Sequence, residues 1–209
     1  MNSDLTFITN EKGQNLKERF EVLIKDTRFF DCLVGYFYAS GFHAIYKSLE
    51  STEKVRILIG ISTNQQTYDL MQKATSNEQS ALQFSSAETK DKLGEVVETE
   101  MENAEDSEKT ENGIYTFIDW IKTGKLEIRA YPSEKIHAKV YIMTFGEEDR
   151  DKGRVITGSS NFTQAGLMDN LEFNVELKNR ADYDFALAKF NELWKDSVDV
   201  SQKYVETIR

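Results

Sequence analysis

Three short segments in the second half of the chain contain polar side chains whose types could act together on a phosphodiester. The first segment holds His137 and Lys139, the second holds Ser159 and Asn161, and the third holds Glu172. A neutral imidazole can attack phosphorus and form a covalent phosphohistidine. Ammonium and carboxamide groups can hold the charged oxygens, and a carboxylate can fix the tautomer of the imidazole. These residue types point to a phosphodiesterase whose mechanism needs no metal ion.

Each of the three segments is expected to be a β-strand. The expected strands cover residues 137–143, 154–160 and 171–177, with Asn161 just past the end of the second. Successive side chains of a strand alternate between its faces, so the imidazole and the ammonium share one face of the first strand. The hydroxyl and the carboxamide lie at the end of the second strand, and Glu172 shares a face of the third strand with Asn174. Strands laid side by side would gather these groups over one patch.

The chain has one further histidine, His43, in an expected helix over residues 40–49. It has no lysine two residues later, so it does not repeat the pattern of His137. One chain thus supplies one imidazole to a reaction in which one group attacks and another protonates the leaving oxygen. A two-fold dimer that pairs two copies of His137 would supply both.

At these residues the chain resembles the phospholipase D superfamily. The signature of that family is His-x-Lys followed by a Gly-Ser-x-Asn turn, which here are His137-Ala138-Lys139 and Gly158-Ser159-Ser160-Asn161. In single-motif nuclease members a glutamate follows the asparagine and orients the histidine, and Glu172 stands at that position. The wider pattern, including Val34-Gly35-Tyr36-Phe37, resembles the phospholipase-D-like domains at the N-terminus of bacterial DNA/RNA helicases. The resemblance covers most of the chain except residues 74–112.

The resemblance implies an α-β-α sandwich, with a mixed β-sheet between helices. It also implies a nuclease that uses no metal or other cofactor, acts on nucleic acid with DNA favoured over RNA, and forms a homodimer with a shared active site. Further helicase domains would then follow Arg209 in a longer chain. The residues that the resemblance makes catalytic are His137, Lys139, Ser159, Asn161 and Glu172. One position departs from the full family motif, because Thr144 stands where that motif has an aspartate.

The composition of the 209-residue chain suits one domain over residues 1–209, since 39% of the residues are hydrophobic. No apolar run is long enough for a membrane span, and residues 1–5 do not begin a signal peptide. Cys32 is the only cysteine, so no disulfide forms within the chain. These features predict a cytoplasmic protein that does not enter the membrane.

The net charge of −10 argues against a generic nucleic-acid binder, which would usually be basic. The charge is uneven, however, because residues 88–111 hold most of the excess acid and residues 122–139 are basic. Three cations near the candidate site are candidate contacts for a nucleic-acid backbone, with ordinary solvation at the surface as an equal alternative: Arg129, Lys135 and Arg154.

The rest of the chain alternates between strand and helix patterns. Expected strands cover residues 31–38, 54–60 and 126–131, and expected helices cover residues 15–25, 40–49, 63–73, 114–122 and 183–198. This order predicts a mixed or parallel sheet between helices. Ser40 is expected to cap its helix, Gly124 to end another in a left-handed conformation, and Phe185 to face the core. Residues 74–112 are polar and acidic, and are expected to form a partly helical insertion.

A second hypothesis remains open beside the enzyme. The same fold would recruit nucleic acid or a partner to a helicase and dimerise, with little or no turnover; the net charge and Thr144 favour this alternative. A lipid substrate ranks third, because the sequence offers no interfacial apolar or basic helix.

Overall fold

The computed structural model describes residues 6–35, 37, 39–60, 108–131, 136–202 and 205. The side chains of residues 39 and 108–111 are not part of this description. The expected helix over residues 63–73, residues 74–107 of the acidic segment, and Lys135 lie outside the described residues.

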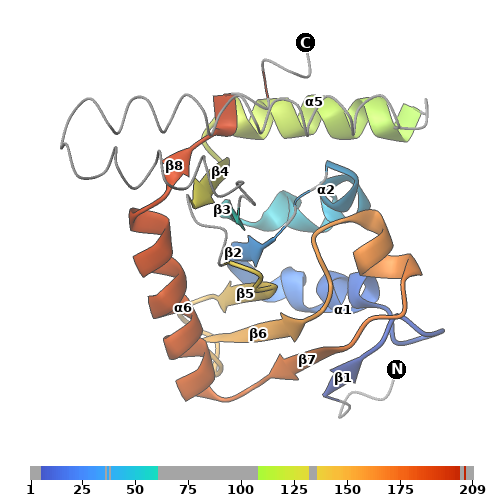
Figure 1. Cartoon of the computed structure of the whole chain (residues 1–209), viewed down its shortest axis with the longest axis vertical. Helices are drawn as coiled ribbons and strands as arrows, with labels where there is room; N and C mark the ends of the chain where they lie inside the picture. Colours follow the sequence, from blue (N-terminus) through green and yellow to red (C-terminus); the bar gives the residue numbers. More distant parts are fainter. Residues whose placement is uncertain are drawn as a thin grey trace, which may run out of the picture.

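Within the described residues, a mixed sheet of eight strands forms the centre of the protein, in the order β1-β7-β6-β5-β2-β3-β4-β8 (Figure 1). β2, β3 and β4 run parallel to one another, and each of the other neighbouring pairs is antiparallel. The strands are β1 (Phe7–Ile8), β2 (Thr27–Val34), β3 (Lys54–Gly60), β4 (Leu126–Tyr131), β5 (Val140–Phe145), β6 (Gly153–Gly158), β7 (Asn174–Leu177) and β8 (Val198–Asp199).

Helices cover both faces of this sheet (Figure 1). One face carries α1 (Leu16–Leu23), α2 (Ala39–Ile45) and α5 (Glu108–Lys122), and the other carries α6 (Arg180–Lys195). The described residues also contain short helical turns: η1 (Ile24–Asp26), η2 (Ser48–Ser51) and the π-helical η3 (Ala165–Asp169). The expected α-β-α sandwich with a mixed sheet is therefore confirmed.

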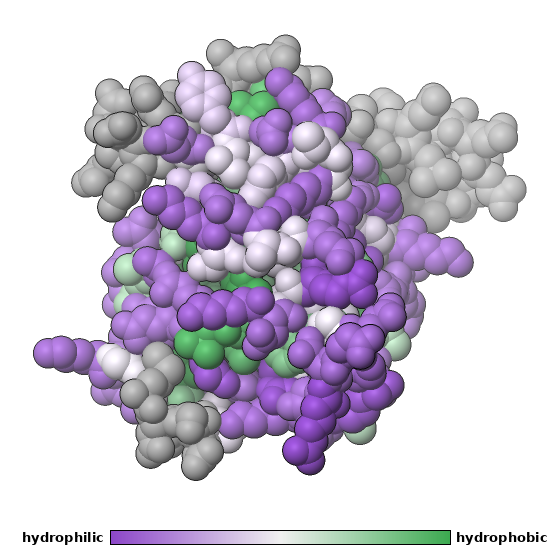
Figure 2. Space-filling model, turned by 180° about the vertical axis from the view of Figure 1, so that it is seen from behind, coloured by the Kyte–Doolittle hydropathy of each residue, from purple (hydrophilic) through white to green (hydrophobic). Residues whose placement is uncertain are grey.

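Apolar side chains alternate across the central strands, so that each strand contributes to two cores. On β5, Tyr141 and Met143 pack with α1, α2 and α5, whereas Ile142 packs with α6. The larger core is rich in aromatic rings, among them Phe20, Phe30, Phe42, Phe117 and Phe162. Cys32 is buried in this core, as expected. On the side of the molecule seen from behind, hydrophilic residues cover most of the surface (Figure 2).

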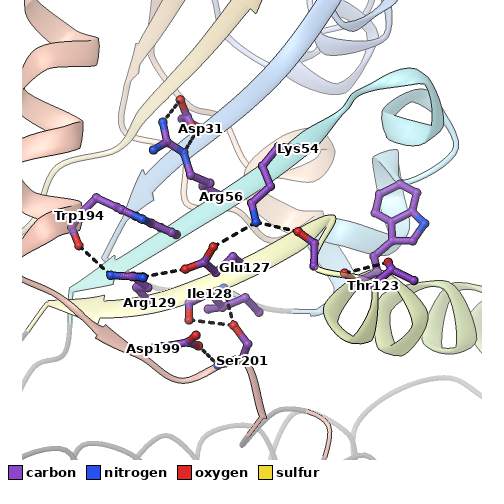
Figure 3. A network of polar contacts seen from close by, with 12 residues as sticks. Asp31, Lys54, Arg56, Thr123, Glu127, Ile128, Arg129, Trp194, Asp199 and Ser201 are labelled. Carbon is purple, nitrogen blue, oxygen red and sulfur yellow. Dashed lines mark hydrogen bonds and ion pairs between the residues drawn. The ribbon is translucent and has the colours of Figure 1, made fainter.

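Two arginines dock α6 onto the sheet (Figure 3). Arg56 of β3 forms an ion pair with the buried Asp31, and its guanidinium lies 4.9 Å from the ring centre of Phe190. Burial raises the pKa of Asp31, an effect that the hydrogen bond and charge of Arg56 oppose. Arg129 of β4 lies 4.9 Å from the ring centre of Trp194. Charged groups of the sheet are thus matched to the aromatic face of the helix.

Several element boundaries differ from those expected. α2 begins at Ala39, so Ser40 lies inside the helix, and its Oγ accepts a hydrogen bond from the Gln164 amide instead of capping. α5 begins at Glu108 rather than near residue 114. Its first turn is polar and carries no apolar stripe, so the hydrophobic periodicity did not reveal this start. Gly124 has φ 76° after α5, as expected for a left-handed ending.

The inner face of α6 also differs at one position. Phe185 is 74% exposed, whereas Phe190 and Trp194 pack against the sheet as expected. Phe185 was expected on the inner stripe, but it lies five residues before Phe190, which places it about 140° around the helix from that ring. Its side chain is left in solvent.

Candidate active site

The three segments predicted to do chemistry meet at one edge of the sheet. β5 and β6 are antiparallel, with Val140 opposite Thr157, so the start of β5 lies beside the end of β6. β6 and β7 are also antiparallel, with Gly158 opposite Asn174. Residues 136–139, 158–161 and 171–173 thus lie together at the ends of three strands, and we call them the site edge.

His137 and Lys139 lie in the segment that leads into β5, since the strand itself begins at Val140. The expectation that both belong to the strand is therefore wrong, although Lys139 is tied to the neighbouring strand. Its carbonyl oxygen accepts hydrogen bonds from the Thr157 hydroxyl at 2.9 Å and from the Gly158 amide at 3.3 Å. The His137 side chain is exposed, and its carbonyl oxygen accepts a hydrogen bond from Nζ of Lys139 at 3.0 Å. An exposed imidazole can be approached by a substrate.

Ser159 connects the turn after β6 to the segment before β7. Its hydroxyl donates a hydrogen bond to Oε2 of Glu172 and accepts one from the Phe173 amide at 2.9 Å. The Ser159 amide in turn donates to the Phe173 carbonyl at 3.1 Å. Glu172 precedes β7, which begins at Asn174, so its expected place inside the strand is also wrong. Ser159 and Glu172 nevertheless form a bonded pair at the site edge.

The described contacts of Glu172 do not include a hydrogen bond to His137. Within one chain, the carboxylate is held by Ser159. The Glu172 carboxylate also affects a buried side chain. The pKa of Tyr141 is raised well above its usual value, chiefly by burial and further by the neighbouring charges of Cys32 and Glu172. The Tyr141 hydroxyl stays protonated and donates to the Ser160 carbonyl at 2.8 Å.

Asn161 is the last residue of the turn after β6, and the ends of β2 and β3 lie beside this turn and the segment before β5. A Cβ atom at Gly35 would come within 3.7 Å of the Asn161 Oδ1. A Cβ atom at Gly60 would come within 2.6 Å of the Ile136 carbonyl oxygen, so glycine is needed there for the segment before β5 to pass. The site edge is therefore packed closely against the ends of the parallel strands.

Asn174 and Ser160 form a buried pair that supports the turn after β6, a role that was not predicted from the sequence. Asn174 and Ser160 are both fully buried. The Asn174 side chain donates to the Ser160 Oγ at 2.9 Å and accepts from the Ser160 amide at 3.2 Å. The signal was present in the sequence, because Asn174 shares the strand face of Glu172, and a polar side chain on a buried strand face must find hydrogen-bond partners.

The cations considered as nucleic-acid contacts have partners within the chain. Arg129 bonds to Glu127 at 2.8 Å and to the Trp194 carbonyl at 3.3 Å (Figure 3). Arg154 bonds to Asp151 and lies 3.4 Å from the buried carboxylate of Glu176. Lys135 lies outside the described residues. Arg129 and Arg154 do not lie at the site edge, and the role of all three residues as nucleic-acid contacts stays a prediction.

The second histidine lies elsewhere in the fold. His43 is part of α2, and its ring packs so closely on α5 that a Cβ atom at Gly113 would come within 2.3 Å of Nδ1. Nδ1 is buried, and no residue of the described ranges hydrogen-bonds to it. Burial lowers the pKa of His43. The site edge of this chain therefore contains one imidazole, that of His137.

Comparisons with known proteins agree with this fold. The family described as "Cardiolipin synthase, PLD-like domain" matches residues 28–194, so the chain belongs to this family of phospholipase-D-like domains. No curated protein sequence matches the chain. Across the described ranges, no group of three or more His, Cys, Asp or Glu side chains is arranged to hold a metal ion, and no helix there is long and apolar enough to cross a membrane.

Solved structures with similar folds include Nuc from Salmonella typhimurium, a phospholipase D family member. It is 16% identical, with a TM-score of 0.50, and the match covers 92% of this chain and 95% of Nuc. Phosphatidylserine synthase from Haemophilus influenzae Rd KW20 is 14% identical, with a TM-score of 0.52, over 96% of this chain and 40% of that chain. The archaeal chromatin protein TrmBL2 is 16% identical, with a TM-score of 0.44, over 96% of this chain and 57% of that chain. The chain thus spans little more than half of TrmBL2 and less than half of the synthase.

Proposed function

We propose that this domain is a metal-independent phosphodiesterase that cleaves nucleic acid, with DNA preferred over RNA. The observation that carries the proposal is the site edge, where three strand ends hold His137 and Lys139, Ser159 and Asn161, and Glu172. Family membership supports phospholipase-D-like chemistry. The proposed context is the N-terminal part of a longer, cytoplasmic helicase chain.

The proposed reaction has two steps. The imidazole of His137 attacks phosphorus, a P–N bond forms, and the P–O bond to the leaving group breaks. The partner subunit's His137, protonated at the start, donates its proton to the leaving oxygen. Water then attacks phosphorus, the P–N bond to His137 breaks, and the partner's imidazole takes a proton from the water, which restores both side chains. Two subunits are required because each provides one imidazole.

The remaining side chains hold the anion and the nucleophile. Lys139 and Asn161 donate hydrogen bonds to the equatorial oxygens, whose charge they balance. Glu172 orients His137 and stabilises its positive charge, while Ser159 fixes the carboxylate. In the single chain Glu172 is bound to Ser159, so its approach to His137 belongs to the dimeric, substrate-bound state.

Labelled single- and double-stranded oligonucleotides of DNA and RNA, incubated with and without EDTA, test the proposal. We expect cleavage that EDTA leaves intact and that His137→Ala or Lys139→Ala abolishes. Lys195→Ala is the matched control, because Lys195 is an exposed lysine at the end of α6. Intact-mass measurement of the quenched protein should show a nucleotide adduct that is absent from His137→Ala. Loss of cleavage in EDTA, with recovery on adding Mg²⁺, would overturn the mechanism.

A binding and dimerisation module without turnover is the second candidate. The observation that favours it is the net charge of −10, which weakens the attraction of a polyanionic substrate. The same oligonucleotides distinguish the two candidates, since a module would shift the mobility of the nucleic acid and leave its length unchanged.

A further inference from the structure

Asn10 joins three parts of the chain: the start of α1, the turn η3, and the segment that leads to β7. It lies between β1 and α1, outside the three segments that were predicted to do chemistry. Its side-chain oxygen accepts a hydrogen bond from the Leu16 amide at 2.9 Å. Its Nδ2 donates to the carbonyl oxygens of Gly166 at 2.9 Å and of Asn170 at 3.0 Å. We call these three hydrogen bonds the Asn10 bridge.

The backbone and the side chain of Asn10 both suit this place. Its φ of 62° is the one positive value among the described residues other than glycine, and asparagine tolerates this left-handed conformation better than most residues do. A carboxamide has an oxygen acceptor and two N–H donors, and the bridge uses the oxygen and both N–H groups. The reverse placement would set the oxygen against two carbonyls, so the surrounding network fixes the orientation of the carboxamide.

One end of the bridge lies against the backbone of Asn161. A Cβ atom at Gly166 would come within 2.4 Å of the Asn161 carbonyl oxygen and 3.2 Å of its amide nitrogen, so the two residues are in direct backbone contact. The Gly166 amide donates to the Thr163 hydroxyl at 3.0 Å, and the Thr163 amide donates to the Asn161 carbonyl at 2.9 Å. A shift of Gly166 would therefore move the backbone that carries the Asn161 side chain.

The other end of the bridge holds the segment that carries Glu172. Asn170 follows η3 and precedes Glu172 by two residues. The Glu172 amide donates to the carbonyl oxygen of Thr9, the residue before Asn10, at 3.3 Å. Two adjacent residues of one loop thus bind the chain at positions 170 and 172. The loop is itself fixed to the core, because Leu16 is fully buried at the start of α1.

We propose that Asn10 is a positioning residue of the active site. Its carboxamide fixes the spacing between Asn161 and Glu172, so that the donor to the phosphoryl oxygens and the carboxylate that serves the imidazole act on one substrate together. The inference rests on the proposed function, because that function gives both residues their parts in the reaction. The Asn174–Ser160 pair supports the turn after β6 from the side of β7, and Asn10 supports the residues that follow this turn.

Loss of the bridge should appear in the rate of the chemical step. In the proposed reaction, Asn161 and Glu172 stabilise charge in the transition state, so their displacement lowers kcat and leaves KM nearly unchanged. A displacement of about 1 Å can lower a rate by about a hundredfold. A merely structural role would reduce the folded fraction, but it would leave the kcat of the folded protein as it is.

Two substitutions remove the bridge in different ways. Asn10→Gly deletes the carboxamide and keeps the left-handed backbone without strain. Asn10→Asp keeps an acceptor for the Leu16 amide but has no donor for the two carbonyls of the bridge. Asn15→Ala is the matched control, because Asn15 caps the same helix by accepting from the Glu18 amide at 3.2 Å, a bond that involves no residue of the site edge.

Amide hydrogen exchange, followed by mass spectrometry of peptic peptides, tests the bridge in the whole chain, and steady-state cleavage of the labelled oligonucleotides tests its effect. For both Asn10 variants we expect faster exchange of residues 161–173 and unchanged exchange of β2 in the core. We expect kcat to fall by about tenfold or more, with KM within about twofold of the wild-type value. Asn15→Ala should match the wild type in kcat and in the exchange of residues 161–173.

The possible results separate this inference from the proposed function. Unchanged exchange of residues 161–173 in both Asn10 variants would overturn the bridge, and faster exchange with wild-type kcat would overturn its positioning role. An equal fall of kcat in Asn15→Ala would assign the effect to α1 and reject the inference. A wild-type chain that cleaves none of the oligonucleotides would reject the nuclease, whereas the bridge would still stand or fall by the exchange measurement.

Discussion

The side-chain amide of Asn174 and the hydroxyl of Ser160 form a 2.9 Å hydrogen bond beneath the turn that carries Ser159 and Asn161. Both partners are fully buried, and the Ser160 amide returns a hydrogen bond to the Asn174 Oδ1. The turn that presents the exposed candidate groups is therefore anchored by the strand that follows Glu172. A site of this kind depends on buried positioning residues as well as on the groups that touch substrate.

Replacing Asn174 should loosen this anchor. Asn174→Ala leaves the buried Ser160 amide without its partner, so we expect the free energy of unfolding to fall by about 2–3 kcal/mol. Cleavage should fall further than stability alone explains, measured as kcat on the fully folded fraction. Ser160→Ala keeps the backbone amide bonded to the Asn174 Oδ1 and should lower both quantities by less. Full activity in folded Asn174→Ala would show that the turn needs no such anchor.

The Ser159–Glu172 pair makes a different prediction, because both groups lie at the surface of the site. Ser159→Ala removes the hydroxyl that holds Glu172 and should lower kcat by about tenfold or more. Its effect on unfolding should be small, since the residue is exposed. Ser159→Thr keeps a hydroxyl and is the conservative control, measured in the same oligonucleotide assay. Equal kcat values for the alanine and threonine variants would argue against a role for this hydrogen bond.

Thr144 provides a test of the one departure from the family motif. It lies four residues after Val140 on β5, about 13 Å along the strand from the site edge. Its hydroxyl shares a 2.8 Å hydrogen bond with that of Tyr183 on α6. Burial raises the pKa of Tyr183, so both hydroxyls stay neutral. The motif position thus docks a helix, and the absence of an aspartate there is weak evidence against turnover.

Thr144→Val and Tyr183→Phe should each lower the free energy of unfolding by about 1 kcal/mol and leave kcat unchanged. The double variant should lower the free energy of unfolding by less than the sum of the two single losses, because both changes remove the same hydrogen bond. Urea unfolding of the four proteins measures this coupling. A large loss of kcat in Thr144→Val with unchanged stability would instead place the residue in the reaction.

Mixed dimers test whether both copies of His137 serve one reaction. Wild-type chain is mixed with His137→Ala, allowed to exchange subunits, and assayed at constant total protein. If one reaction needs two imidazoles, the rate should follow the square of the wild-type fraction, because only wild-type pairs act. A rate proportional to the wild-type fraction would show that each chain works alone.

The sequence predicted the arrangement of the fold and the meeting of three segments, because strand and helix periodicities are local signals. It misplaced His137, Lys139 and Glu172 inside strands, although all three precede strand starts. A strand ends where the neighbouring strand stops pairing with it, and a local sequence pattern does not contain this information. The Asn174–Ser160 anchor was missed for a related reason, since it joins positions whose contact depends on the register of β6 and β7.

The buried ring of His43 predicts how stability depends on pH. Burial lowers the pKa of His43 in the folded chain, so the unfolded chain binds a proton at higher pH than the folded chain does. The stabilising contribution is therefore fully present above the unfolded value of about 6.5 and is lost as the pH falls toward the folded pKa. Urea unfolding of the wild type between about pH 7.5 and about pH 5.5 should show a steeper loss of stability than His43→Leu, which has no group to titrate there. The same slope in both proteins would mean that the α2–α5 contact tolerates an imidazolium, and that other groups cause the acid sensitivity.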